Sequence, residues 1–225
     1  MKKVSVLIPT RKRYEMFSKS VDSLFNTCNN IDNFEVLVAL DNDDIETIEK
    51  IKEYSIQRPN VKSFCYERYG YRGLNLYIND LCTKASGTSL FLWNDDAIMK
   101  SQDWDLEILK HHEKFCVISP KVENMEDFWM NKGVLFPILP KKWVEITGEF
   151  SHHPSCDSWI DVLGKRLNLI DKKESIVIYH DRYELTGNNQ DETYGDVRKD
   201  VSFGFSHFPE IWEEHFTKLN SYLNH

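Results

Sequence analysis

The sequence predicts an α/β fold with a mostly parallel central sheet flanked by helices. Over residues 1–100, short apolar segments rich in β-branched residues alternate with stretches that carry apolar residues at helical spacing. The connections between these segments are short, which favours right-handed strand–helix–strand units that share one sheet. In sheets of this kind the ligand site lies off the carboxyl ends of the strands.

Four buried strands and three amphipathic helices account for this alternation. The strands are expected at residues 3–9, 34–40, 61–66 and 89–93, and the helices at residues 17–28, 45–51 and 74–85. Asp43 and Glu46 have the spacing of a capping box at the start of the second helix. Ser86 and Gly87 close the third helix.

The second half of the chain is less regular. We expect strands or extended segments at residues 117–119, 134–139 and 176–179, and helices at residues 159–167 and 210–224. Residues 188–200 are polar and acidic, which is typical of a loop. No internal repeat, linker or domain boundary stands out, so residues 1–225 are expected to form a single domain.

Composition excludes several classes of protein. The net charge of -8 argues against general nucleic-acid binding, which needs a basic face. Five scattered cysteines without a C-x-x-C pair indicate reduced thiols, and therefore a cytoplasmic setting rather than a disulfide framework or a zinc site. The first residues leave no room for a signal peptide, and no apolar run approaches the roughly 20 residues of a transmembrane segment.

Three predicted strands end on polar clusters. Thr10-Arg11 follows the first strand, Asp41-Asn42-Asp43 follows the second, and Asn94-Asp95-Asp96 follows the fourth. Because the carboxyl ends of parallel strands meet at one edge, these clusters are expected to face one crevice. Adjacent carboxylates there suit a divalent cation that bridges two phosphates, although an Asp-rich turn is the alternative.

These elements resemble the nucleotide-diphospho-sugar transferases of glycosyltransferase family 2, which have the GT-A fold. Over roughly the first 110 residues the resemblance rests, in order, on VSVLIPTRKR, VALDNDD, Asn79 with Ala85-Ser86-Gly87, and FLWNDDAIM. The second half matches more loosely, through Cys156-Asp157-Ser158-Trp159 and His180. The resemblance implies a GT-A domain with its nucleotide-donor half in residues 1–100 and its acceptor half in residues 101–225.

Three departures from the family pattern matter. The second strand ends on Asp41-Asn42-Asp43-Asp44 instead of D-D-G-S, and Ile78-Asn79 stands where an Arg-Asn pair is usual. A phosphate-facing arginine must then come from elsewhere, and Arg72 is the nearest candidate; the alternative is a surface arginine. The Q-x-x-R-W motif of processive synthases is absent.

The resemblance implies a donor site with a metal. Asp95 and Asp96 correspond to the metal-binding pair for Mn²⁺ or Mg²⁺, with Asp96 the direct ligand and His180 a further ligand. The alternatives are a turn or helix cap for the acids and a structural role for the histidine. Pro9, Thr10, Arg11, Asp41, Asn94 and Asp95 would line the donor pocket, where the Asp41 carboxylate can accept an N–H of the base.

The same resemblance implies that Asp157 is the catalytic base, which takes the proton of an acceptor hydroxyl. The alternative is an acid in the first turn of a helix, where the macrodipole favours it. Asp161, one turn on, is the second candidate for the base. Residues 188–194 could form a lid over the donor, and a disordered segment or a surface loop is the alternative. The pairs at residues 111–112 and 152–153 are expected to be surface histidines, and Trp159 a core residue.

The sequence therefore favours a metal-dependent, inverting glycosyltransferase that moves a sugar from a nucleotide-sugar donor, UDP-linked by preference, to a glycan or other hydroxyl acceptor. A non-catalytic sugar- or nucleotide-binding or assembly protein with the same fold is the first rival. A sugar-phosphate nucleotidyltransferase is the second, but P-T-R-K-R lacks the glycines of its phosphate loop. An oxidoreductase is disfavoured because no G-x-G-x-x-G follows the first strand. The oligomeric state is not predicted.

Overall fold

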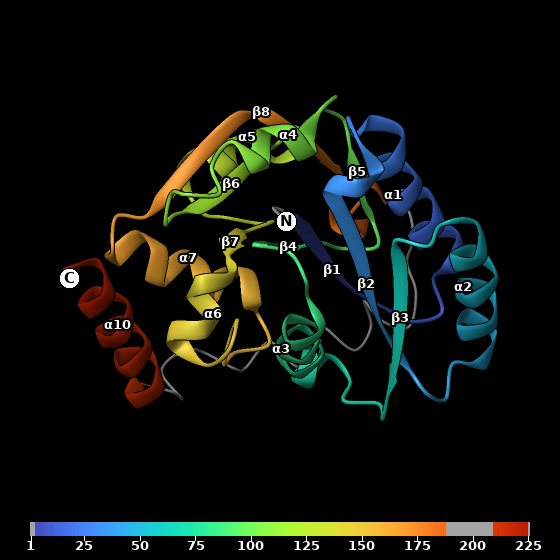
Figure 1. Ribbon diagram of the computed structural model, residues 1–225, viewed down its shortest axis with the longest axis horizontal. Helices are drawn as coiled ribbons and strands as arrows, with labels where there is room; N and C mark the ends of the chain where they lie inside the picture. Colours follow the sequence, from blue (N-terminus) through green and yellow to red (C-terminus); the bar gives the residue numbers. More distant parts are fainter. Residues whose placement is uncertain (1–2, 188–208, 225) are drawn as a thin grey trace.

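A computed structural model describes residues 3–187 and 209–224 of the chain. Within them, one eight-stranded sheet runs in the order β3-β2-β1-β4-β7-β6-β8-β5, and it curls between the flanking helices (Figure 1). The strands are β1 (Val4–Thr10), β2 (Phe34–Asp41), β3 (Val61–Tyr66), β4 (Ser89–Leu92), β5 (Ala97–Met99), β6 (Val117–Val122), β7 (Ile138–Pro140) and β8 (Ile170–His180).

The sheet is parallel in its first half and mixed in its second. β1 pairs in parallel with β2 and β4, and β2 pairs in parallel with β3, as the alternation of strands and helices predicts. Beyond β4, the pairs β4–β7, β6–β7 and β5–β8 are antiparallel, and β6–β8 is parallel. The carboxyl ends of β1, β2 and β4 therefore meet at one edge, where the three polar clusters were expected to converge.

Helices cover both faces of the sheet. Alternate residues of β1 explain this, because Val4, Val6 and Ile8 pack into one apolar cluster while Leu7 packs into the other. The first cluster takes side chains from α1 (Tyr14–Thr27), α2 (Ile45–Gln57) and α4 (Trp104–Leu109). The second takes them from α3 (Leu74–Lys84), α6 (Lys141–Thr147), α7 (Cys156–Arg166) and α10 (Pro209–Leu223). The remaining short helices are η1 (Ile31–Asn33), η2 (Tyr71–Gly73), η3 (Glu123–Met125), α5 (Glu126–Asn131) and α8 (Tyr183–Thr186).

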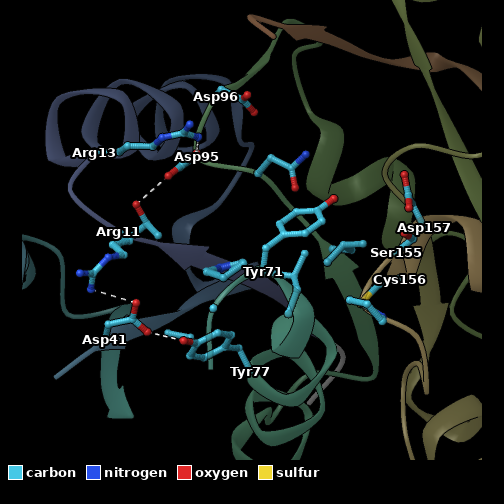
Figure 2. A pocket seen from close by; sticks show the side chains of 18 of the residues that line it. Arg11, Arg13, Asp41, Tyr71, Tyr77, Asp95, Asp96, Ser155, Cys156 and Asp157 are labelled. Atoms are coloured by element: carbon cyan, nitrogen blue, oxygen red, sulfur yellow. Dashed lines mark hydrogen bonds and ion pairs between the residues drawn. The ribbon is translucent and has the colours of Figure 1, made fainter. Parts of the chain in front are cut away.

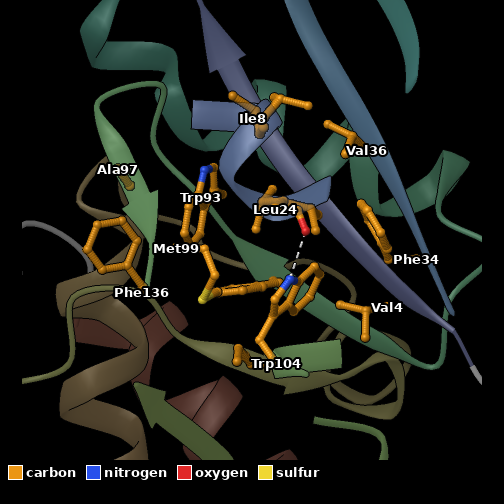
Figure 3. Close-up of a cluster of buried hydrophobic side chains, with 14 of the residues drawn as sticks. Val4, Ile8, Leu24, Phe34, Val36, Trp93, Ala97, Met99, Trp104 and Phe136 are labelled. Atoms are coloured by element: carbon orange, nitrogen blue, oxygen red, sulfur yellow. Dashed lines mark hydrogen bonds between the residues drawn. The ribbon is translucent and has the colours of Figure 1, made fainter. Parts of the chain in front are cut away.

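Indole rings fill the first cluster and also satisfy their own polar atoms. Trp104 is fully buried, and its Nε1 donates a hydrogen bond to the carbonyl oxygen of Leu24 at 3.0 Å (Figure 3). Trp93 is fully buried as well, and its Nε1 donates to Ser20 Oγ at 2.7 Å. These bonds tie α1 to β4 and α4 at no cost in unpaired N–H groups.

The turn between α3 and β4 requires a glycine. A Cβ atom at Gly87 would lie 2.6 Å from the carbonyl oxygen of Lys3 and 2.7 Å from the backbone nitrogen of Ser5. The Gly87 N–H instead donates to Ser5 Oγ at 2.9 Å. This close approach explains the position of the Ser86-Gly87 pair that closes the third helix.

The capping prediction for α2 was wrong. The N-cap is Asp44, whose side chain accepts the N–H of Thr47 at 3.4 Å, and Asp43 turns away to pair with Arg11. Both aspartates are suitable N-cap residues, but Asp43 is bound by Arg11, and Asp44 therefore occupies the capping position.

The irregular second half also departs from expectation. The expected extended segment at residues 134–139 is a strand only over Ile138–Pro140, whereas the strand expected at residues 176–179 spans Ile170–His180. The short elements β5, α4, α5 and α6 were not predicted. His153 was expected at the surface but is buried, whereas Trp159 lies in the core as predicted. The expected loop at residues 188–200 lies outside the described residues.

Candidate active site

A cavity of about 290 Å³ opens at the carboxyl ends of β1, β2 and β4 (Figure 2). Its wall also takes residues from the segment 68–77, from the start of α7 and from the end of β8. All but one of the predicted site residues line it, namely Pro9, Thr10, Arg11, Asp41, Asn94, Asp95, Asp96, Asp157 and His180. Arg72 is exposed and does not line it.

Asp95 is held by the last residue of β1 and by a residue of the turn that follows it. Thr10 Oγ1 donates to Asp95 Oδ2 at 2.7 Å, and Arg13 Nη1 donates to Asp95 Oδ1 at 3.3 Å. Burial raises the pKa of Asp95, and the charge of Asp96 adds to that rise, while Arg13 and Thr10 oppose it. Each carboxylate oxygen of Asp95 therefore accepts a protein donor, Thr10 on one and Arg13 on the other.

Asp41, at the end of β2, lies between two donors. Arg11 Nη1 donates to Asp41 Oδ2 at 3.0 Å, and the Tyr77 hydroxyl donates to Asp41 Oδ1 (Figure 2). Arg11 also pairs with both oxygens of the exposed Asp43, and this pairing, more than Asp41, raises the pKa of Arg11 despite its burial. The guanidinium therefore stays charged and fixed at the mouth of the cavity.

Asp96 and His180 meet across the pairing of β5 with β8. In this antiparallel pair Ala97 lies opposite His180, which brings the imidazole beside the residue that precedes β5. His180 Nε2 lies 3.1 Å from Asp96 Oδ1, and both side chains are buried. The backbone on each side of His180 is fixed, because Asn124 bonds both its N–H and its carbonyl and the Asp181 N–H donates to the Asp96 carbonyl at 2.8 Å.

The Asp96–His180 pair is a partial ligand set. One carboxylate and one imidazole suit Mn²⁺ or Mg²⁺ in their chemistry, but no group of three or more His, Cys, Asp or Glu side chains in residues 3–187 and 209–224 is arranged to hold an ion. A metal at this pair would need oxygen ligands from a bound diphosphate or from water. The residues present therefore fit a metal that arrives with a phosphate-bearing ligand.

Asp157 lies in the first turn of α7, on the far wall of the cavity from Asp41 (Figure 2). Its Oδ1 accepts the Ser158 N–H at 2.7 Å and lies 3.4 Å from Ser158 Oγ. Burial raises the pKa of Asp157, and the bonds from Ser158 and the charges of Arg182 and His180 only partly offset the rise. A carboxylate of raised basicity at a cavity wall is suited to accept a proton.

Asp161, the second candidate for the base, has a structural role. Its Oδ1 accepts the N–H of Val134 at 3.1 Å, and its Oδ2 pairs with Lys165 Nζ at 2.7 Å. Asp161 does not line the cavity. These contacts leave Asp157 as the acid of α7 that faces the cavity.

Two asparagines of α3 anchor the segment that leads to Asp157. Asn79 Oδ1 accepts the N–H groups of Phe150 and Ser151 at 2.9 and 3.1 Å, and Asn79 Nδ2 donates to the Ser151 carbonyl at 2.8 Å. Asn75, one turn earlier, donates to the His152 carbonyl at 3.0 Å. Helix α3 thus holds the segment that leads to Asp157.

The sequence interpretation missed several residues of the cavity wall. Arg13, Arg68 and Arg182 bring positive charge to it in place of Arg72, and Tyr71 and Tyr77 bring phenolic rings. Arg68 belongs to the same segment as Arg72, and Arg182 lies two residues after His180, so position along the chain was a usable signal for both. Nothing in the spacing of Tyr77 separates it from the core residues of its helix.

The fold is the GT-A fold, and the comparison of sequences shows which family the chain belongs to. The family profile described as glycosyl transferase family 2 matches residues 5–161. The chain therefore belongs to glycosyl transferase family 2 and is a glycosyltransferase by family, as the resemblance implied. No curated protein matches the chain by sequence.

Solved structures of low sequence identity share the fold. A mannosyltransferase from Pyrobaculum calidifontis, in complex with GDP-Man and Mn²⁺, superposes with a TM-score of 0.67 at 12% identity, over 99% of this chain and 75% of the other. S. aureus TarS 1-349 in complex with UDP superposes with a TM-score of 0.64 at 15% identity, over 91% of this chain and 73% of the other. The same protein in complex with UDP-GlcNAc gives 0.60 at 14% identity, over 98% and 73%.

None of the helices in residues 3–187 and 209–224 has the length and apolar character needed to cross a bilayer. The five cysteines carry free thiols, in line with the absence of a C-x-x-C pair. Three of them, Cys82, Cys116 and Cys156, are buried.

Proposed function

We propose that the chain is a metal-dependent, inverting glycosyltransferase. It moves a sugar from a nucleotide-sugar donor, for which a UDP-sugar is the first candidate, to a hydroxyl group of a glycan or other acceptor. One observation carries the proposal. Asp41 and the Asp96–His180 pair line one side of a single cavity, and Asp157, whose pKa is raised by burial, lines the other side. The complexes of similar structures with GDP-Man and UDP-GlcNAc support a nucleotide-sugar donor. The free thiols agree with a cytoplasmic location.

On the donor side, Asp41 accepts an N–H of the base, and Pro9, Thr10 and Asn94 line the pocket around the nucleoside. Asp96 and His180 would hold the metal, which would supply positive charge to neutralise the diphosphate. Asp95 fixes Thr10 and Arg13 and thereby shapes the metal side of the pocket. Arg72 is exposed, so we assign its predicted role toward the phosphates to the arginines that line the cavity.

On the acceptor side, Asp157 accepts the proton of the attacking hydroxyl. The oxygen of that hydroxyl forms a bond to the anomeric carbon as the bond between this carbon and the phosphate oxygen breaks. The electron pair of the broken bond leaves with the nucleoside diphosphate, and the proton stays on Asp157. Attack on the face opposite the leaving group inverts the anomeric configuration.

Calorimetric titration with UDP, GDP, CDP and ADP, each with and without Mn²⁺, tests the donor site. We expect one diphosphate to bind in a manganese-dependent manner, and Asp96→Ala to abolish the dependence. Asp127→Ala, which removes an exposed acid of α5, is the matched control and should bind as the wild type does.

Two results would contradict the proposal. Absence of binding to all four diphosphates would leave a GT-A protein without a donor site. Tight binding without release of diphosphate from any of a panel of UDP- and GDP-sugars, with water or simple sugars as acceptors, would favour the non-catalytic rival.

A further inference from the structure

Asp41 is a tightly constrained carboxylate of the cavity wall. Arg11 Nη1 donates to its Oδ2 at 3.0 Å and the Tyr77 hydroxyl donates to its Oδ1, so each oxygen receives a different protein donor (Figure 2). Asp41 is 6% exposed. Two donors on opposite oxygens prevent the carboxylate from rotating, and its direction in the cavity is therefore set by the protein rather than by the ligand.

Tyr77 is itself held from two sides. Its hydroxyl oxygen accepts the backbone N–H of Tyr69 at 2.8 Å, which leaves its single proton directed at Asp41. Its ring packs against Tyr69 and Tyr66, with ring centroids 4.9 Å and 5.8 Å away. Tyr77 is only 6% exposed. Burial and the bond to Asp41 raise the pKa of Tyr77 to about 12, so the phenol keeps its proton at neutral pH.

A carboxylate held in this way can accept further N–H groups but cannot donate. Of its roughly four lone-pair positions, two are taken by Arg11 and Tyr77, and the others remain for a ligand. Uracil and guanine carry an N–H in the pyrimidine ring that such an oxygen can accept. Cytosine and adenine have an acceptor nitrogen at the matching position, and its lone pair would repel the lone pair of the carboxylate oxygen.

We propose that Tyr77 is a positioning residue that, together with Arg11, fixes the Asp41 carboxylate and so makes the enzyme prefer nucleotides whose base has a ring N–H. The inference rests on the proposed donor site, because it assigns a cause to the base preference of that site. Tyr77 acts through Asp41 and takes no part in the chemistry of sugar transfer.

The test compares binding of UDP, CDP, GDP and ADP in the presence of Mn²⁺ by calorimetry for the wild type and Tyr77→Phe. We expect the preference for UDP over CDP, or for GDP over ADP, to fall by about tenfold, the effect of losing one hydrogen bond to a charged group. The matched control is Tyr66→Phe, which removes a hydroxyl that donates to Asp80 at 2.6 Å outside the cavity wall. It should leave the preference within about twofold.

A double-mutant cycle separates positioning from direct contact. In the Asp41→Ala background, Tyr77→Phe should not change UDP or GDP affinity further, since the group through which Tyr77 acts is gone. Independent, additive losses would overturn the inference, because they would mean that Tyr77 touches the nucleotide itself or only supports the fold. Thermal melting verifies that each variant is folded, and Tyr77→Met replaces Tyr77→Phe if the latter is not.

The outcomes are distinguishable from failure of the proposed function. A wild-type protein that binds none of the four diphosphates overturns the donor site and this inference with it. A wild-type protein that prefers UDP or GDP, together with a folded Tyr77→Phe variant of unchanged preference, overturns the inference alone.

Discussion

Buried carboxylates occur at both ends of the parallel strands, and their surroundings differ. At the start of β2, Glu35 accepts hydrogen bonds from Ser5 Oγ at 2.7 Å, from the Ser86 N–H at 2.7 Å and from Lys62 Nζ at 2.9 Å. Burial alone would raise the pKa of Glu35, but these donors outweigh it and lower the pKa to about 2. The charge is fully compensated by the protein.

At the cavity, Ser158 is the one residue among 3–187 and 209–224 that donates to Asp157, and burial leaves the pKa of Asp157 raised. The same fold therefore uses carboxylates in two ways, according to how many hydrogen-bond donors surround each of them. A carboxylate that is saturated with donors ties elements together, whereas an under-compensated one at a cavity wall is ready to accept a proton or bind a cation. Four predictions test this distinction between saturated and under-compensated carboxylates.

The largest effect is expected for Asp157→Asn. Removal of a general base slows transfer by about a thousandfold, because such groups contribute roughly 10²- to 10⁴-fold. The melting temperature should change little, since the amide fits the same half-buried position. Steady-state assays of diphosphate release from the donor identified by titration measure the first effect, and calorimetry measures the second.

The control for this prediction is Asp161→Asn on the same helix. Because Asp161 pairs with Lys165 and accepts the Val134 N–H, its substitution should lower stability and leave kcat within severalfold of the wild type. A large loss of kcat in Asp161→Asn with none in Asp157→Asn would exchange the roles of the two acids.

The next effect is expected for Glu35→Gln. The amide retains one acceptor oxygen but loses the charge that Lys62 and Ser86 compensate, so the free energy of unfolding should fall by about 2–3 kcal/mol. Urea denaturation measures the change. Donor affinity should stay as in the wild type, since Glu35 does not line the cavity. A variant as stable as the wild type would contradict the view of Glu35 as a tie between elements.

A smaller effect is expected for Asn79→Ala. Asn79 bonds the backbone of Phe150 and Ser151, so its loss should cost about 1–2 kcal/mol of stability. It should also lower kcat severalfold, because the segment before Asp157 becomes less fixed. Asn124→Ala, which frees the backbone of His180 instead, should weaken manganese-dependent binding. If Asn79→Ala and Asn124→Ala changed kcat and manganese-dependent binding to the same extent, the effects would reflect only a general loss of stability.

The last prediction concerns pH and has a direction only. Because the pKa of Glu35 is lowered from 4.5 to about 2 in the folded protein, its contribution to stability is complete above pH 4.5 and is lost as pH falls toward 2. Asp157 must be ionised to accept a proton, and its pKa is raised above 3.8. Activity should therefore be largely lost on acidification before the Glu35 contribution disappears completely near pH 2, and a pH–rate profile recorded beside melting curves tests this expectation.

Part of this organisation was predictable from sequence alone. Buried parallel strands read as continuous apolar runs, so β1 to β4 and the polar residues that end them could be placed from local pattern. Local pattern was insufficient where neighbours compete or elements are short. Asp44 rather than Asp43 caps α2 because Arg11, more than thirty positions away, takes the other acid. The three-residue strand β5 is too short to carry a period, and its place depends on its pairing with β8 and its contact with α1.

The class of fold, the edge of the sheet that holds the site and the carboxylates that could act there all follow from local pattern, because periodicity and strand ends are local properties. Which of these acids are compensated by donors depends on how the elements pack. Asp41 between Arg11 and Tyr77 and Asp96 beside His180 both depend on residues that are far apart in the chain. Charge compensation is a through-space property, and it is fixed only when the strands and helices pack.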